Sequence, residues 1–177
     1  MLTGDVRITS GKAKIMNYDV EKSLDNARKH YGYCPQDDGI DPLLNSYEQL
    51  ELYGRLRGLS KQDVAISSKY LITALGLTRY ATKRCGTYSG GNKRKLSTAV
   101  ALIGNPDVVF LDEPTSGMDP GARRQLWKLI INITHMGKSV ILTSHSMEEC
   151  EALCTRLAIM VNGNFTCLGS LQHLKNR

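Results

Sequence analysis

Two adjacent carboxylates, Asp112 and Glu113, close an unbroken run of large apolar residues, Val108–Leu111. Such a run is typical of a strand that is buried on both faces of a sheet. Carboxylates at its end could hold a divalent cation and polarise a water molecule for attack on a phosphoryl group. An Asp-Glu pair alone is more often a solvated turn, so other elements must decide between these interpretations.

A phosphoryl-transfer site also needs groups that hold the phosphates, commonly a GxxxxGK[ST] loop between a strand and a helix. Gly137–Ser139 matches only the end of this motif, because Asn132 stands where the first glycine belongs. Gly11–Ala13 lacks the final hydroxyl, and Val6 replaces the first glycine. The 177 residues therefore contain no phosphate-binding loop of this kind.

A second candidate for anion binding is Ser89–Asn92, where a Ser-Gly-Gly sequence opens a predicted helix. Unobstructed backbone N–H groups at the positive end of a helix dipole favour anions. The helix itself is predicted by one apolar stripe at helical spacing, formed by Leu96, Ala99, Val100 and Ile103. A Ser-Gly-Gly turn is commonplace by itself, so its weight depends on the motifs around it.

Strand-length apolar runs alternate with helix-period segments, which is typical of an α/β domain with a largely parallel sheet. The candidate strands are Tyr31–Pro35, Val108–Asp112, Ser139–Ser144 and Leu157–Val161. The last three have the apolarity of strands that are covered on both faces. Residues 46–75 predict one or two helices, broken near Gly58–Ser60, which form a helical insert. Asn162–Asn164 predicts a hairpin turn, because Asn-Gly adopts positive φ angles.

Capping residues mark the predicted helix starts. The pairs are Asp119 with Pro120, Ser46 with Gln49, and Ser146 with Glu149.

The composition is that of a folded globular domain, with 41% hydrophobic and 23% charged residues. No apolar run approaches the roughly 20 residues that cross a bilayer, and the N-terminus lacks a signal pattern, so we expect this segment to be soluble. The net charge of +6 permits nucleic acid, anionic lipid or polyphosphate as ligands. A basic cluster such as Lys93–Lys95 is most simply a solvated helix face. The five cysteines have no zinc-binding spacing.

Taken in order, these motifs resemble the nucleotide-binding domain of ABC transporters. Tyr88–Asn92 is similar to the signature sequence, with Tyr88 as an apolar replacement for the usual leucine. The segments that resemble the Q-loop, the Walker B element, the D-loop and the switch histidine are Tyr33–Gln36, Val108–Pro114, Ser116–Pro120 and Thr143–His145. The amino-acid sequence of nearly the whole chain is similar to that of the A subfamily, whose full-length members are eukaryotic exporters of lipids and sterols.

The resemblance implies roles for these residues in the hydrolysis of ATP with Mg²⁺. Glu113 would be the general base, and Asp112 would bind Mg²⁺ directly or through water. Gln36 would hold Mg²⁺ or the attacking water, and His145 would donate a hydrogen bond to the γ-phosphate. ATP held by a second nucleotide-binding domain would contact the signature residues Ser89, Gly90, Gly91 and Asn92 and the D-loop residue Asp119.

The resemblance also implies an α/β fold of the P-loop NTPase type, with a mainly parallel sheet, helices on both faces and a helical subdomain. Residues 1–36 would end the N-terminal core region and carry the Q-loop, residues from about 42 to 90 would form the helical subdomain, and residues from about 91 to 177 would complete the core. In this family the first strand, the phosphate-binding loop and the helix after it precede sequence of this kind. We therefore expect a fragment that lacks them and does not bind ATP alone.

The implied partners are a second nucleotide-binding domain and transmembrane domains, at the cytosolic face of a membrane, with no nucleic acid. Two alternatives stay open. One is a regulatory or pseudo-ATPase module without a phosphate-binding loop, which donates its signature sequence to another domain. The other is the head of a chromosome or DNA-repair ATPase, which the basic charge permits but the lack of sustained heptads disfavours.

Overall fold

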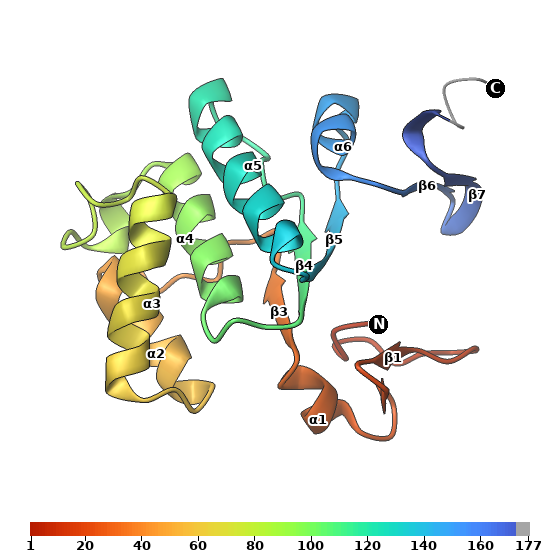
Figure 1. Cartoon of the computed structure of the whole chain (residues 1–177), viewed down its shortest axis with the longest axis horizontal. Coiled ribbons are helices and arrows are strands. Elements are labelled where there is room, and N and C mark those ends of the chain that lie inside the picture. Colours follow the sequence, from red (N-terminus) through yellow and green to blue (C-terminus); the bar gives the residue numbers. More distant parts are fainter. Residues whose placement is uncertain (173–177) are drawn as a thin grey trace. The chain divides into compact units, whose positions relative to one another are not determined.

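The computed structural model of the chain describes residues 1–172. It divides into two compact units, Met1–Thr143 and Ser144–Arg177. The first unit contains a parallel sheet with most of the helices, and the second contains a helix and a hairpin (Figure 1). No helix among the described residues has the length and apolarity that a membrane crossing requires.

The centre of the first unit is a three-stranded sheet in the order β3-β4-β5. Its parallel strands are β3 (Tyr31–Cys34), β4 (Val108–Asp112) and β5 (Ser139–Thr143). Val108 pairs with Tyr31 on one side and with Ser139 on the other, so the strands start level and their carboxyl ends meet at one edge. The expected α/β fold with a mainly parallel sheet is confirmed.

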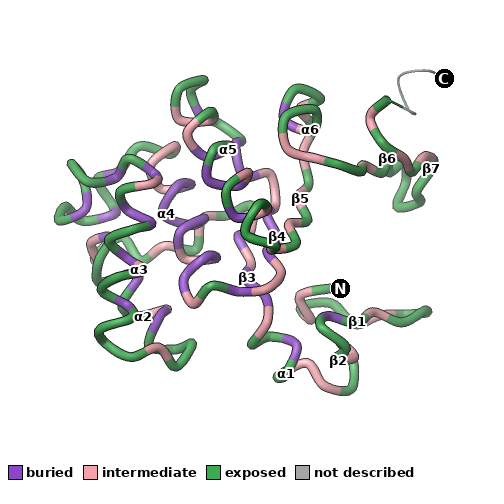
Figure 2. The backbone as a smooth tube through the Cα atoms, in the orientation of Figure 1, coloured by how far each residue is buried: buried purple, intermediate pink, exposed green. Residues whose placement is uncertain are grey.

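Helix α4 (Gly90–Leu102) packs on one face of this sheet, and α5 (Pro120–His135) follows β4 in the chain. Leu96 and Ala99 of the predicted stripe are fully buried. Val109 and Leu111 of β4 are buried too, because alternate residues of a strand share one face. Figure 2 shows that buried residues concentrate in α4 and in the two strands β3 and β4.

The N-terminal segment covers the other face of the sheet over β3 and β4. It contains the short ladder of β1 (Lys14–Ile15) with β2 (Tyr18–Asp19), and helix α1 (Leu24–Arg28). An apolar cluster joins this segment to the sheet, and its buried members are Ile15, Val20, Ala27, Tyr31 and Phe110. The Tyr31 and Phe110 rings meet edge to face, with centroids 5.5 Å apart.

Burial on both faces was expected for β5, and this prediction is wrong for the described residues. Ile141, which pairs with Phe110, is 49% exposed. Ser139 and Thr143 are exposed as well. Apolar composition predicts a covered strand only where other elements supply the cover, and the cluster of the N-terminal segment does not extend over this strand.

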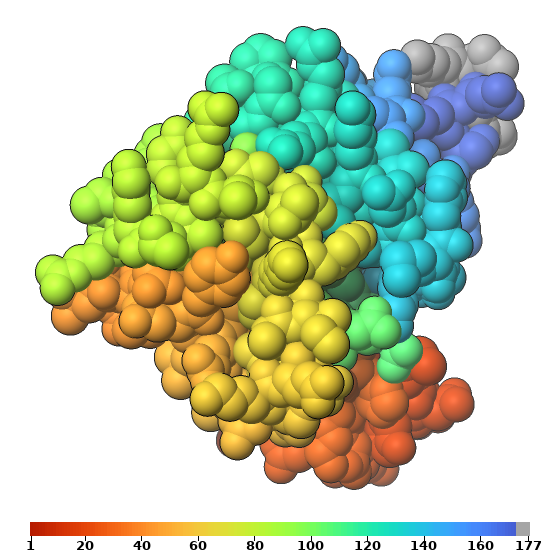
Figure 3. Space-filling model, turned by 60° about the vertical axis from the view of Figure 1, so that its left-hand side comes forward, coloured from red at the N-terminus to blue at the C-terminus, as the bar shows by residue number. Residues whose placement is uncertain are grey.

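The predicted helical insert is present as α2 (Ser46–Leu56) and α3 (Lys61–Ala74). The break falls where it was predicted, since Gly58 has a φ of 84° and Ser60 caps α3. Both helices pack against α4, which is reached through the short 3₁₀ helix η1 (Cys85–Thr87). Figure 3 shows this insert and the segment leading to α4 as one continuous surface.

The predicted cap of α2 is wrong by one residue. Asn45, not Ser46, is the N-cap, and its side chain accepts hydrogen bonds from the N–H groups of Tyr47 and Glu48. The Glu48 carboxylate accepts from the Asn45 N–H in return at 2.8 Å. Ser46 instead begins the helix as a fully buried residue. An asparagine competes equally well with serine for the cap, which the sequence alone does not resolve.

The second unit contains α6 (Met147–Leu153) and the antiparallel strands β6 (Leu157–Val161) and β7 (Asn164–Gly169). Ser146 caps α6 as expected, and Asn162 and Gly163 turn the hairpin with φ angles of 50° and 78°. The prediction that Leu157–Val161 is a parallel strand covered on both faces is wrong. It pairs with β7 alone among the described strands, and four of its five residues are exposed, because a two-stranded hairpin cannot cover its own faces.

The close crossing of β3 and α4 requires glycine at position 32. A Cβ at Gly32 would lie 1.8 Å from the backbone oxygen of Ala101, which cannot rotate away. We expect Gly32→Ala to lower the free energy of unfolding by about 3 kcal/mol, at the upper end of overpacking effects. Denaturant titration of the chain measures this change. Gly90→Ala adds a methyl group in open space and is the control; equal denaturation midpoints for the two variants would contradict the close crossing.

Candidate functional site

The two acids lie where β4 ends, beside the end of β5. Asp112 is the last residue of β4, and Glu113 follows with a φ of 46°, in the left-handed region that non-glycine residues rarely adopt. The hydroxyl of Thr143 donates to the Asp112 carboxylate. The Glu113 N–H donates to Thr143, with the side-chain oxygen at 3.1 Å and the backbone oxygen at 3.2 Å. Thr143 therefore holds the turn that carries both carboxylates.

Gln36 lies two residues beyond the end of β3, the strand next to β4. The guanidinium of Arg94, on α4, contacts the ends of both strands. Its Nη1 donates to the backbone oxygens of Pro35 and Gln36, the latter at 3.1 Å, and its Nη2 donates to the backbone oxygen of Asp112. One planar group thus spans both segments. The structure therefore gathers Gln36, Asp112 and Glu113 at one edge of the sheet.

Sequence reasoning missed Arg94 and Thr143. Arg94 and Lys95 belong to the basic cluster that was interpreted as a solvated helix face, but they are only 4% and 6% exposed. The burial of Arg94 and Lys95 could have been predicted from the small residues that follow them in the sequence, because a helix with small residues on several faces can be buried all round. These are Ser97, Thr98, Ala99 and Ala101. For Thr143 no comparable signal exists, because its partners come from another strand.

Two side chains of β3 lie close to the gathered residues. Burial raises the pKa of the Tyr33 phenol, and the negative charge of Asp112 raises it further. Burial likewise raises the pKa of the Cys34 thiol, which lies 3.4 Å from the hydroxyl oxygen of Ser97. A thiol that is buried and kept protonated packs as a small apolar group and is not a nucleophile.

Ser89–Asn92 opens α4, as predicted. Ser89 is the N-cap, and its Oγ accepts a hydrogen bond from the Asn92 N–H at 3.3 Å. A hydroxyl that accepts one hydrogen bond can still donate another, through its O–H group, to an anion. A Cβ at Gly90 would meet no atom within 4 Å, so the backbone at Gly90 is open to a ligand.

Tyr88 does more than replace an apolar residue. Its ring is buried, but its hydroxyl donates to the backbone oxygen of Tyr80 at 2.7 Å and lies 2.7 Å from the Ser46 hydroxyl. Ser46 is the first residue of α2. The entrance to the signature sequence is thus hydrogen-bonded to the helical insert.

The D-loop segment lies beside the signature sequence. Asp119 caps α5 as predicted and accepts from the N–H groups of Gly121 and Ala122 at 2.9 and 3.0 Å. The hydrogen bond from Ala122 lowers the pKa of Asp119. A Cβ at Gly91 would lie 3.9 Å from Met118 Cγ. The start of α4 and the start of α5 are therefore neighbours.

His145 lies in the second unit, in the turn that leads to α6, and is exposed. Its convergence with the acids of the first unit stays a prediction from the sequence.

Asp112 and Gln36 are of the residue types that bind Mg²⁺, and the phosphates of a nucleotide would supply further ligands. Carboxylate and amide oxygens, which Asp112 and Gln36 offer, are the ligands that Mg²⁺ prefers. No group of three or more His, Cys, Asp or Glu residues arranged for a metal occurs in residues 1–172. In ATPases, Mg²⁺ is usually held by one or two carboxylates together with substrate phosphates.

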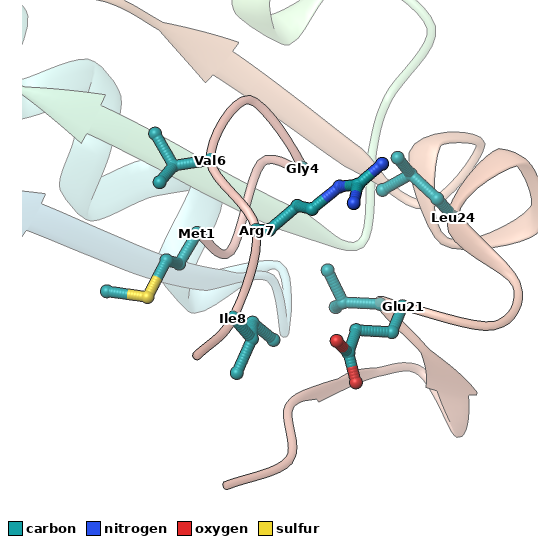
Figure 4. Close-up of a pocket in the computed structure, with 8 residues that line it drawn as sticks. Met1, Gly4, Val6, Arg7, Ile8, Glu21 and Leu24 are labelled. Atoms are coloured by element: carbon teal, nitrogen blue, oxygen red, sulfur yellow. The ribbon is translucent and has the colours of Figure 1, made fainter. Parts of the chain in front are cut away.

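A hollow of about 420 Å³ lies elsewhere, in the N-terminal segment (Figure 4). Its lining residues are Met1, Gly4, Val6, Arg7, Ile8, Val20, Glu21 and Leu24. None of the predicted site residues is among them. Arg7 and Glu21 are its only charged side chains, so it does not offer the several phosphate donors that a nucleotide needs.

Comparisons with known proteins show which families and structures the chain resembles. A family model described as ABC transporter matches residues 1–116, and a model of an AAA domain matches residues 84–151. The chain is 60% identical to human ATP-binding cassette sub-family A member 2 over all 177 residues. It is 56% identical, over the same length, to the human retinal-specific phospholipid-transporting ATPase ABCA4 and to the human phospholipid-transporting ATPase ABCA7. The chain spans only 7% of the first of these relatives and 8% of the other two.

Solved structures share the fold. A dimeric post-hydrolysis state of the ATP-binding cassette MJ0796, bound to ADP and Pi, superposes with a TM-score of 0.85 at 21% identity, over 96% of this chain and 77% of that one. The ATP-binding subunit of another ABC transporter has a TM-score of 0.85 at 24% identity, over 95% of this chain and 70% of that one. With the family model covering more than half of its residues, the chain belongs to the ABC transporter family.

Proposed function

We propose that this chain is part of the ATP-hydrolysing domain of a transporter that moves lipid across a membrane. One observation carries the proposal for the site. A single guanidinium contacts the backbone of both Gln36 and Asp112, so these two residues are held near each other at the carboxyl edge of a parallel sheet, and Glu113 follows Asp112 directly. This edge is where open α/β sheets bind their ligands.

At this site Glu113 would accept a proton from, or orient, the attacking water, and Asp112 would bind Mg²⁺ directly or through water. Gln36 would complete the ligand set or hold the water, because an amide both accepts and donates. His145 would donate to the γ-phosphate. When bound, Mg²⁺ would neutralise charge on the β- and γ-phosphates.

The signature face would act on a nucleotide held by a second nucleotide-binding domain. The Ser89 hydroxyl could donate a hydrogen bond to a phosphate oxygen, and the backbone at Gly90 and Gly91 could approach the phosphate closely. Asn92 and Asp119 would lie at the same interface. The dimer of the cassette MJ0796 supports a paired arrangement.

The lipid assignment rests on the relatives. Two human proteins that are 56% identical to the whole chain are named phospholipid-transporting ATPases. By this similarity, the partners of the chain would be a second nucleotide-binding domain and transmembrane domains, and it would lie at the cytosolic face of the membrane.

The general base is tested in the full-length protein that contains this chain, reconstituted in lipid vesicles. We expect Glu113→Gln to lower the rate of ATP hydrolysis by about 10²–10⁴-fold, because the amide cannot accept the proton of the attacking water. Binding of ATP, followed by equilibrium titration, should persist. Glu51→Gln, an exposed site on α2, is the control. Hydrolysis by Glu113→Gln at the control rate would refute the assignment.

The hydroxyl of Thr143 should matter for the alignment of the acids. Thr143→Val keeps the shape of the side chain but removes the donor to Asp112 and one of the two acceptors for the Glu113 N–H, because only the backbone oxygen remains. We expect kcat for ATP hydrolysis to fall about tenfold, which corresponds to about 1.4 kcal/mol. Thr143→Ser retains the hydroxyl and should restore most of the rate. If valine and serine gave the same kcat, the hydroxyl would have no such role.

The 177-residue chain by itself should bind MgATP weakly, because its sequence has no GxxxxGK[ST] loop. Charge-assisted hydrogen bonds contribute roughly 1.5–3 kcal/mol each, so the lack of two phosphate donors weakens binding by about 10²–10⁴-fold. Titration with a fluorescent ATP analogue measures the affinity, with the full-length protein as the reference. Micromolar affinity of the isolated chain would show this expectation to be wrong.

A further inference from the structure

Pairing between β3 and β4 ends just before the proposed site. The last paired residues are Cys34 and Leu111, and the next residues are Pro35 and Asp112. Proline has no N–H group, so Pro35 cannot donate a further hydrogen bond to β4. The backbone oxygens of Pro35, Gln36 and Asp112 instead accept hydrogen bonds from outside the β3–β4 ladder.

Arg94 supplies the missing donors. Its Nη1 donates to the Pro35 and Gln36 oxygens and its Nη2 donates to the Asp112 oxygen. The two nitrogens of a guanidinium have a fixed separation and lie in one plane, so these contacts set how far apart the two backbone segments lie. A lysine ammonium is a single point on a flexible stem and cannot impose this spacing.

The surroundings of Arg94 keep the guanidinium in place. Its side chain is 5% exposed, and the carboxylate of Asp38 lies 3.5 Å from Nη1. The carboxylate and the three backbone oxygens are the partners of the two Nη atoms, whereas the buried Nε has no hydrogen-bond partner among the described residues. The partners of Arg94 are backbone oxygens and the Asp38 carboxylate, so its contact with Gln36 and Asp112 is through their backbone.

We propose that Arg94 is a positioning residue that sets the separation of Gln36 and Asp112, and thereby the affinity of the site for its divalent cation. This inference rests on the proposed function, which makes these two residues the metal ligands. Outer-shell partners of metal ligands commonly change metal affinity by about 10–100-fold when they are replaced. Arg94 belongs to this class of residue, although it contacts the ligands through the backbone and not through their side chains.

The chain offers a matched control at the other end of the same strand. Arg57, from α2's C-terminal cap, donates through Nη2 to the backbone oxygen of Tyr31 at 3.0 Å. Burial lowers the pKa of Arg57, so this guanidinium is also partly desolvated. Arg57 and Arg94 therefore share a residue type, a strand and a kind of contact, but only Arg94 contacts the proposed ligand segments.

The experiment measures Mn²⁺ binding, as a paramagnetic substitute for Mg²⁺, in the full-length protein with saturating ATP. All variants carry Glu113→Gln, so that nucleotide is not consumed. We expect Arg94→Lys to raise the Kd of Mn²⁺ by about tenfold, while the Kd of ATP measured without metal stays within about twofold. Arg57→Lys should leave the Kd of Mn²⁺ unchanged, although it lowers the melting temperature.

A second variant leaves Arg94 itself in place. Asp38→Asn removes the carboxylate that anchors the guanidinium, and we expect the Kd of Mn²⁺ to rise by about threefold, as for the loss of a partly exposed ion pair. If Arg94→Lys does not fold, this variant decides the question. An unchanged Kd in Asp38→Asn, or in a folded Arg94→Lys, overturns the proposal, as does an equal loss of Mn²⁺ affinity in Arg57→Lys.

Failure of the proposed function would look different. Hydrolysis that continued in the Glu113→Gln background would refute the role of Glu113, whatever the Mn²⁺ affinities were. Loss of hydrolysis in Glu113→Gln together with unchanged Mn²⁺ affinity in the Arg94 variants would refute the role of Arg94 alone.

Discussion

A positive charge that is almost completely buried must find its hydrogen bonds inside the protein. In the candidate site this requirement links Arg94 to the ends of two strands. The two Nη atoms of Arg94 find their hydrogen-bond partners in backbone oxygens from two neighbouring strand ends and in the Asp38 carboxylate, and only the buried Nε has no such partner among the described residues. Breaking such a set by removing one partner is costly, because the remaining groups stay buried without compensation. The ends of β3 and β4 are therefore held together by a side chain from outside the sheet. The backbone pairing of the strands has ended by that point.

The close packing of α4 on the sheet is what allows Arg94 to reach these oxygens. Gly32 lets the backbone of α4 approach β3 at Ala101, where any side chain would collide with a carbonyl. The small residues of α4 allow the helix to be buried nearly all round, and this carries Arg94 and Lys95 into the interior. Lys95 then donates to Gln125 on α5 at 2.9 Å. The small residues at Gly32 and along α4 thus allow the guanidinium of Arg94 to lie at the strand ends.

The sequence predicts what local chemistry controls and misses what tertiary contacts control. β4, the break at Gly58 and the caps at Asp119 and Ser146 follow from apolar runs, positive φ angles and side-chain capping, all of which depend on near neighbours in the chain. The cover of β5 and of Leu157–Val161 depends on other elements, so apolarity alone predicted it wrongly. Thr143 and Arg94 escaped notice for the same reason, since their partners lie on other strands and only the folded chain brings them together.

Tyr88 shows how a substitution that looks conservative can change the connection between parts of a domain. An apolar residue at this position would fill the same buried space but would leave the Ser46 hydroxyl and the Tyr80 carbonyl without this partner. With tyrosine, the first residue of the signature sequence is hydrogen-bonded to the first turn of α2, and α4 is packed against α2 and α3. A displacement of the helical insert would therefore carry the signature residues with it. Arg94, one turn further along α4, would pass the same displacement to the ends of β3 and β4, because its guanidinium is bonded to both.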